Sequence, residues 1–87
     1  MISKDIEVKA RHGLHLRVAA KIVEMIKDSN TKITFSKDGL SADAKSILEL
    51  LLLGAVEKSI IQVTVDGEDE EKTIENVSDI LIDGAGI

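Results

Sequence analysis

Residues 32–42 read KITFSKDGLSA, and this segment indicates which kind of sheet the chain forms. Polar and apolar residues alternate on both sides of Asp38-Gly39, with the apolar positions held by Ile33, Phe35, Leu40 and Ala42. An Asp-Gly pair between two alternating runs is typical of the two-residue turn of a β-hairpin. In so short a chain a hairpin favours an antiparallel sheet over the parallel sheet that alternating strands and helices usually suggest.

Upstream of the hairpin, the sequence predicts a strand followed by a helix. Between residues 2 and 10 the apolar residues fall on even positions, which is the period-two pattern of a strand with one buried face. From Leu16 the apolar residues recur at positions 19, 22, 23 and 26, the spacing of an amphipathic helix. Asp28-Ser29-Asn30 is expected to end this helix.

Downstream of the hairpin, Ser46 precedes the apolar run 47–53, and Glu49 follows it by three residues. This spacing is the capping-box pattern of a helix start, in which each side chain accepts a bond from the other residue's backbone N–H. Gly54 is expected to end the short helix.

The remaining pattern predicts a strand over 61–65 and a last helix that ends at Gly84. The acidic run 68–71 lies where the helix dipole favours negative charge. The order βαββαβα predicts one α+β domain over residues 1–87, with a four-stranded antiparallel sheet and three helices on one face. The other face should be open to water, with outward positions at Lys32, Thr34, Gln62 and Thr64.

Composition excludes several classes of protein. The 87 residues include no cysteine, which rules out disulfides and cysteine metal sites. A net charge of −5 and the absence of Tyr and Trp make a nucleic-acid partner unexpected. Neither a signal-peptide pattern nor a run long enough to span a bilayer is present, so we expect no membrane partner and a cytoplasmic location.

His15 stands where the cap of the first helix should be, in place of the usual Ser, Thr, Asp or Asn. The backbone N–H groups of Leu16, Arg17 and Val18 then lack partners within the helix and suit an anion. The Arg17 guanidinium can grip phosphate oxygens, and an imidazole that is partly neutral near pH 7 can act as a nucleophile. The site could therefore hold a phosphoryl group on His15 itself.

Two simpler interpretations compete with this one. His15 could be an ordinary loop histidine near a helix start. Alternatively, His12 and His15 could bind a metal ion, but the loop offers no cysteine or carboxylate as a third ligand, so we expect no metal. We also expect no cofactor.

Two motifs together carry a resemblance to a known family over essentially the whole chain. They are Gly13-Leu14-His15-x-Arg17 followed by Ala19-Ala20, and Asp43-Ala44-Lys45-Ser46-Ile47 running to Leu53-Gly54. The sequence resembles HPr, the histidine-containing phosphocarrier family of the phosphoenolpyruvate-dependent phosphotransferase system. The resemblance implies the family's open-faced β-sandwich and a monomer that is not an independent enzyme. It also implies that His15 takes a phosphoryl group from Enzyme I and passes it to an EIIA domain, assisted by Arg17.

The resemblance implies a second, regulatory site at Ser46. In many relatives the matching serine is phosphorylated by a kinase, HPr kinase/phosphorylase, and the product acts with a catabolite-control transcription factor. Added negative charge at a helix start would stabilise the helix and repel an acidic partner surface. The simpler interpretation is that Ser46 is only a helix cap, and regulation through Ser46 with little use of His15 is the alternative function.

The leucines of the second helix raise a further question, because a short helix cannot bury all of them. The resemblance implies a partner-docking patch formed by Ile47, Leu48, Leu51 and Leu52. An exposed apolar patch is more often a partner site than an accident. The alternative is that Leu48 and Leu51 close the core and only Leu52 is exposed.

The chain departs from the family pattern inside the phosphate-binding turn. Leu16 replaces a small residue, and Val18 replaces a proline, which returns a backbone donor to the turn. Carriers of the nitrogen-related branch also lack that proline, so the departure bears on the sugar-transport role rather than on phosphorylation. His12 is unusual there too, and it either points to water or lies within reach of the phosphate.

Overall fold

The observed order of elements confirms the predicted βαββαβα arrangement. The computed structural model describes residues 1–84. Its strands and helices are β1 (Ile2–Glu7), α1 (Leu16–Ile26), β2 (Lys32–Lys37), β3 (Leu40–Asp43), α2 (Ile47–Leu52), β4 (Ile60–Asp66) and α3 (Glu70–Asp83).

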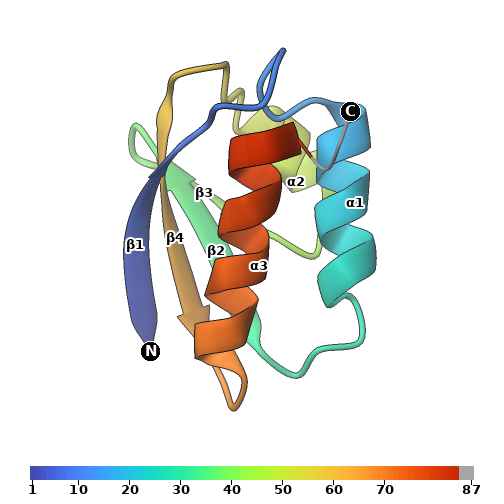
Figure 1. Ribbon diagram of the computed structural model, residues 1–87, viewed down its shortest axis with the longest axis vertical. Helices are drawn as coiled ribbons and strands as arrows, with labels where there is room; N and C mark the ends of the chain where they lie inside the picture. The colour runs from blue at the N-terminus through green and yellow to red at the C-terminus, as the bar shows by residue number, and fades with distance from the viewer. Residues whose placement is uncertain (85–87) are drawn as a thin grey trace.

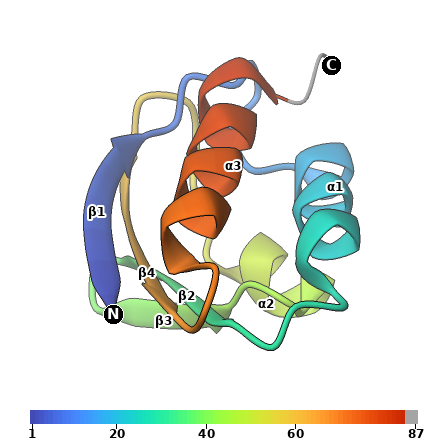
Figure 2. The ribbon, with the colours of Figure 1, turned by 60° about the horizontal axis from the view of Figure 1, so that its bottom comes forward.

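The four strands form one antiparallel sheet in the order β1-β4-β2-β3. All three helices lie on one face of it, and the other face is uncovered (Figure 2). The helix α3 packs on β1 and β4, α2 packs beside β3, and α1 contacts both other helices. The predicted α+β open-faced sandwich is therefore confirmed.

The hairpin predicted around Asp38-Gly39 forms between β2 and β3. Residues Lys37 and Leu40 pair across it, and the two turn residues Asp38 and Gly39 both have positive φ, 51° and 83°. Positive φ at both central residues defines the turn type whose twist matches a β-hairpin.

The core lies between the sheet and the helices and is almost wholly aliphatic. Phe35 is the largest fully buried side chain, and the strand residues Ile33, Ile61 and Val63 beside it are no more than 1% exposed. A core of this kind explains how a chain with one aromatic residue remains stable, because apolar area removed from water contributes about 25 cal/mol per Å².

The first strand is shorter than predicted. The alternating pattern runs to Ala10, but β1 ends at Glu7. Val8 still exchanges bonds with residues 58 and 59, and the N–H groups of Lys9 and Ala10 both donate to the Leu81 carbonyl at 3.1 Å. Val8 and Ala10 stay buried because the chain turns from the sheet onto the end of α3.

The open face of the sheet carries polar side chains, as expected. Lys32 and Gln62 are exposed, whereas Thr34 and Thr64, which pair directly opposite each other across β2 and β4, are half-buried. Neighbouring hydroxyls pair across the strands on this face, for example Ser3 with Thr64 at 3.0 Å. Among residues 1–84, no helix is long and apolar enough to cross a membrane.

Candidate functional site

His15 is the N-cap of α1, as predicted. Its backbone is extended, with φ −92° and ψ 179°, and its carbonyl accepts the first helical bond from the Ala19 N–H at 2.9 Å. Its ring nitrogen Nδ1 accepts a hydrogen bond from the Arg17 backbone N–H at 3.3 Å. An acceptor nitrogen carries a lone pair, so the lone pair of Nδ1 faces the start of the helix.

The three backbone groups expected to bind phosphate belong to the first turn of α1. Leu16, Arg17 and Val18 are its first three residues, whose N–H groups have no helical carbonyl four residues earlier. The Arg17 side chain is exposed, and the α1 dipole adds positive potential at the same place. The Val18 side chain is fully buried, so this residue serves the core as well as the turn.

The loop before His15 is held on both sides by backbone contacts. Gly13 donates to the Ala10 carbonyl and Leu14 donates to the Ala55 carbonyl, both at 2.9 Å. Gly13 has φ +71°, and a Cβ there would lie 2.5 Å from the Ala55 oxygen. Only glycine lets the loop approach the segment after α2 this closely.

Ser46 caps α2, since its Oγ accepts from the Glu49 N–H at 3.2 Å. The predicted capping box forms only in part. The Glu49 carboxylate accepts from the Asp43 N–H at 3.0 Å, whereas the Ser46 N–H donates to the Asp43 carbonyl at 2.9 Å. The simple helix-cap interpretation therefore describes Ser46 in the unmodified protein.

The leucines of α2 and of its C-cap, Leu53, divide clearly between core and surface. Leu50 and Leu53 are buried, whereas Leu48 and Leu52 are 67% and 70% exposed. Ile47 and Leu51 are each 37% exposed. The alternative in which Leu48 and Leu51 close the core is wrong, because Leu50 and Leu53 fill that place.

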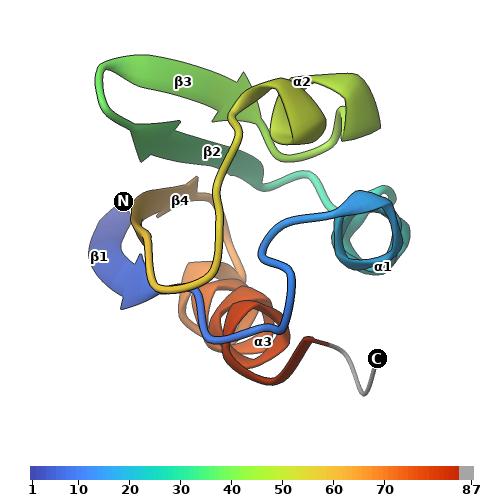
Figure 3. The same ribbon diagram turned by 90° about the horizontal axis from the view of Figure 1, so that it is seen from above.

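Leu16 was expected to supply a backbone N–H and to replace a small residue in the turn, but no role was predicted for its side chain. That side chain is 61% exposed at the start of α1, and α1 packs against α2 (Figure 3). The exposed Leu16 side chain thus belongs to the same helical side of the molecule as the α2 leucines. The exposure of Leu16 could have been predicted, because this residue lies before the buried stripe of α1, which starts at Val18.

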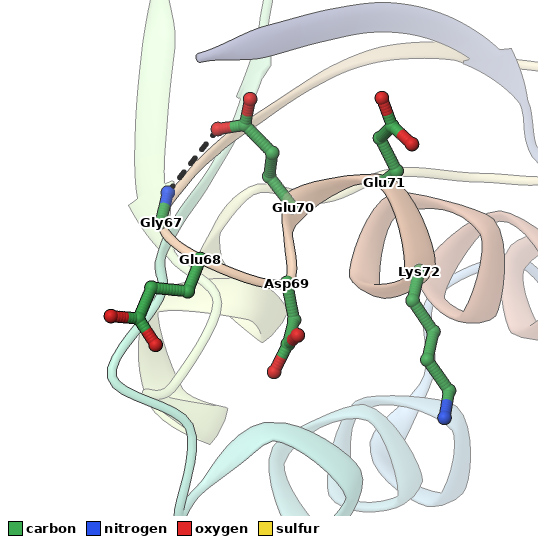
Figure 4. Close-up of a pocket in the computed structure, with 6 residues that line it drawn as sticks. All are labelled: Gly67, Glu68, Asp69, Glu70, Glu71 and Lys72. Carbon is green, nitrogen blue, oxygen red and sulfur yellow. Dashed lines mark hydrogen bonds between the residues drawn. The ribbon is translucent and has the colours of Figure 1, made fainter.

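A surface hollow lined by residues 67–72 lies at the start of α3. Its lining includes four carboxylates. Figure 4 shows Glu70 turned back towards Gly67, and the Glu70 carboxylate accepts a hydrogen bond from the Gly67 N–H at 3.3 Å. A hydrogen bond from the Met1 amine, followed by that from Gly67, holds the pKa of Glu70 below its ordinary value. Helices α1 and α3 run in opposite directions, so this hollow and His15 lie at opposite ends (Figure 1). Its negative charge makes it unsuited to phosphate.

The described residues contain no group of three or more His, Asp or Glu side chains placed to hold a metal ion. The rings of His12 and His15 are neighbours, with centroids 6.4 Å apart and planes at 71°. Two imidazoles without a third ligand fall short of a structural zinc site.

These features define a class: a small open-faced α+β sandwich with a histidine at a helix start that suits an anion. The family model described as the PTS HPr component phosphorylation site matches residues 2–83. The chain is 40% identical over 77 residues to phosphocarrier protein HPr of Haemophilus influenzae, covering 88% of this chain and 91% of the relative.

Solved structures agree with the sequence match. Phosphocarrier protein HPr from Bacillus anthracis superposes with a TM-score of 0.87 at 30% identity, covering 92% of this chain and 95% of the other. HPr-C-His from Thermoanaerobacter tengcongensis superposes with a TM-score of 0.86 at 32% identity, covering 93% and 91%. The chain belongs to the HPr family, the phosphocarriers of the phosphotransferase system.

Proposed function

We propose that this protein accepts a phosphoryl group on His15 from phospho-Enzyme I and passes it to an EIIA-type domain. The observation that carries the proposal is the bond from the Arg17 N–H to His15 Nδ1, which turns the ring's lone pair towards the helix start. The match to a family model described by its phosphorylation site supports the same role.

The chemistry follows from that arrangement. The Nδ1 lone pair attacks phosphorus, the N–P bond forms, and the bond to the donor's histidine breaks with its electron pair returning to that donor. The Arg17 N–H, which donates to Nδ1 in the free protein, then has a phosphoryl oxygen to bind instead. The N–H groups of Leu16 and Val18 and the Arg17 guanidinium can bind further phosphoryl oxygens. Transfer to the acceptor reverses these steps, so the protein is a carrier rather than an independent catalyst.

The partner surface in this proposal is the exposed apolar group of α2, namely Ile47, Leu48, Leu51 and Leu52. It lies on the helix that packs against α1, whose first residue follows His15. A docking partner would therefore meet the apolar group and the phosphoryl group together. We further propose one functional domain over residues 1–87, a monomer, in the cytoplasm, where Enzyme I operates.

The proposal is tested by incubating the protein with phosphoenolpyruvate and Enzyme I and measuring intact mass. We expect one acid-labile phosphoryl adduct that disappears in His15→Ala. Absence of the adduct in the unmodified protein, or its persistence in His15→Ala, would overturn the assignment. An ATP-dependent, acid-stable adduct lost only in Ser46→Ala would instead support the regulatory role, which the family relatives at 40% identity do not favour.

The residue at position 18 should tune how firmly the phosphoryl group is held. Val18→Pro removes one N–H from the first turn of α1, where proline is tolerated. A single bond to a phosphoryl oxygen stabilises by about 1 kcal/mol, so we expect phospho-His15 to be lost or transferred about fivefold faster in the variant. The measurement is the decay of the acid-labile adduct with time.

Val18→Ala is the matched control, because it removes buried methyl groups but keeps the N–H. The phosphoryl adduct on His15 should decay in this variant at the same rate as in the unmodified protein. Equal decay in Val18→Pro, or an equal acceleration in both variants, would rule out a role for the Val18 donor.

A further inference from the structure

His12 occupies a strained but well-anchored position beside His15. Its φ is +71°, a left-handed conformation that few residues other than glycine adopt. The next residue, Gly13, has the same φ, and its N–H donates to the Ala10 carbonyl. Two successive left-handed residues reverse the chain, which brings two side chains three positions apart side by side.

The two imidazole rings meet edge to face, with centroids 6.4 Å apart. The His12 side chain is exposed and that of His15 is half-buried. The His12 ring is therefore a close neighbour of any group attached to the His15 ring.

We propose that His12 is a second binding residue for the phosphoryl group on His15, and donates a charge-assisted hydrogen bond to it when protonated. This inference rests on the proposed function. A phosphoryl group carries close to two negative charges, and bonds between ionised partners are about twice as strong as neutral ones. His12 thus stabilises the loaded carrier most in its cationic form.

The loop and the segments that bond to it or follow it carry several charged or titratable groups. They are Arg11 in the loop, Arg17 and His15 at the start of α1, Glu57 and Lys58 after α2, and Asp83 at the end of α3. Binding of a phosphoryl group and protonation of His12 must favour each other equally, since coupling between two sites is reciprocal.

The decisive measurement is the NMR titration of the His12 ring before and after His15 is phosphorylated with phosphoramidate, which needs no Enzyme I. We expect the pKa of His12 to rise by about half a unit to one unit, a three- to tenfold coupling. An unchanged pKa, or failure of phosphoramidate to load His15, would overturn the inference. Phosphoramidate treatment of the His15→Ala variant shows whether any phosphate is placed on His12 itself.

A second readout separates binding from a merely structural role. In His12→Asn, which keeps a residue that tolerates left-handed backbone, phospho-His15 should decay about threefold faster than in the unmodified protein near pH 6. The difference should shrink as the pH is raised towards 8, since a deprotonated imidazole cannot donate a charge-assisted bond. A difference that is independent of pH would mean a structural effect and would contradict the proposal.

Lys27→Asn is the matched control, since it removes one positive charge at the far end of α1. It should leave the decay unchanged at both pH values. If Enzyme I fails to load His15 while phosphoramidate loads it and the pKa of His12 rises, the proposed function fails and this inference stands.

Discussion

Substitution of Gly13 by alanine is expected to lower the free energy of unfolding by about 3 kcal/mol, with a fall in Tm of roughly 15 °C. Two costs combine at this position. The backbone has φ +71°, and an added Cβ would lie 2.5 Å from the Ala55 oxygen and 2.8 Å from the Val56 Cα. All three of the nearest atoms belong to the backbone, so no side chain can turn aside to relieve the clash.

The clash also reaches the candidate site. The Ala55 carbonyl that the new methyl group would strike is the acceptor for the Leu14 N–H, next to His15. Movement of that segment would lengthen or break the bond that anchors the loop. We therefore expect slower phosphorylation of His15 in the variant even at temperatures where it remains folded.

Gly39→Ala provides the matched control. Gly39 also has positive φ, +83°, but nothing lies within 4 Å of its added Cβ. Its cost should be only that of the left-handed backbone, about 1 kcal/mol, with no effect on phosphorylation. Unfolding in denaturant measures both variants. Equal destabilisation by the two substitutions would show that the contact with Ala55 is unimportant.

Leu48→Glu is expected to reduce the efficiency of phosphoryl transfer from Enzyme I by at least about tenfold. Leu48 is 67% exposed on α2, so its replacement removes no core contact. Truncating or charging a buried anchor of an interface commonly costs about 1.4 kcal/mol or more, which corresponds to a tenfold change. The loss should appear chiefly in KM, because the chemistry at His15 is unaltered.

Ile60→Glu controls for the added charge. Ile60 is 61% exposed on β4, next to the buried Ile61, so it faces the side of the sheet opposite the helices. We expect its transfer kinetics to match those of the unmodified protein, with Tm within about 3 °C for both variants. A loss of similar size in Ile60→Glu would show that net charge, not the α2 surface, governs the encounter.

Local signals in the sequence were sufficient for most of the fold. Asp38-Gly39 specifies its turn through backbone conformations that few residue pairs accept, and Gly84 ends α3 in the left-handed conformation expected of a helix stop. His15 as the cap of α1 was likewise predictable, because the change from period two to the helical period brackets it closely.

Features that depend on contacts distant in sequence could not be predicted in the same way. The alternation through Ala10 does not reveal that residues 9 and 10 bond to Leu81 instead of a strand. Glu49 has the capping-box spacing, but its carboxylate accepts a hydrogen bond from the Asp43 N–H rather than from the Ser46 N–H. The approach of the His12 ring to His15 requires two left-handed residues in succession, which no periodicity encodes.

The uncovered face of the sheet has a consequence for how this sequence can change over time. Its hydroxyl and amide side chains contribute to neither the aliphatic core nor the end of the molecule that carries His15. The only sequence requirements on this face are residues that favour a strand and keep the protein soluble. Neutral drift should therefore accumulate on this face, while the helical side changes only in step with its partners.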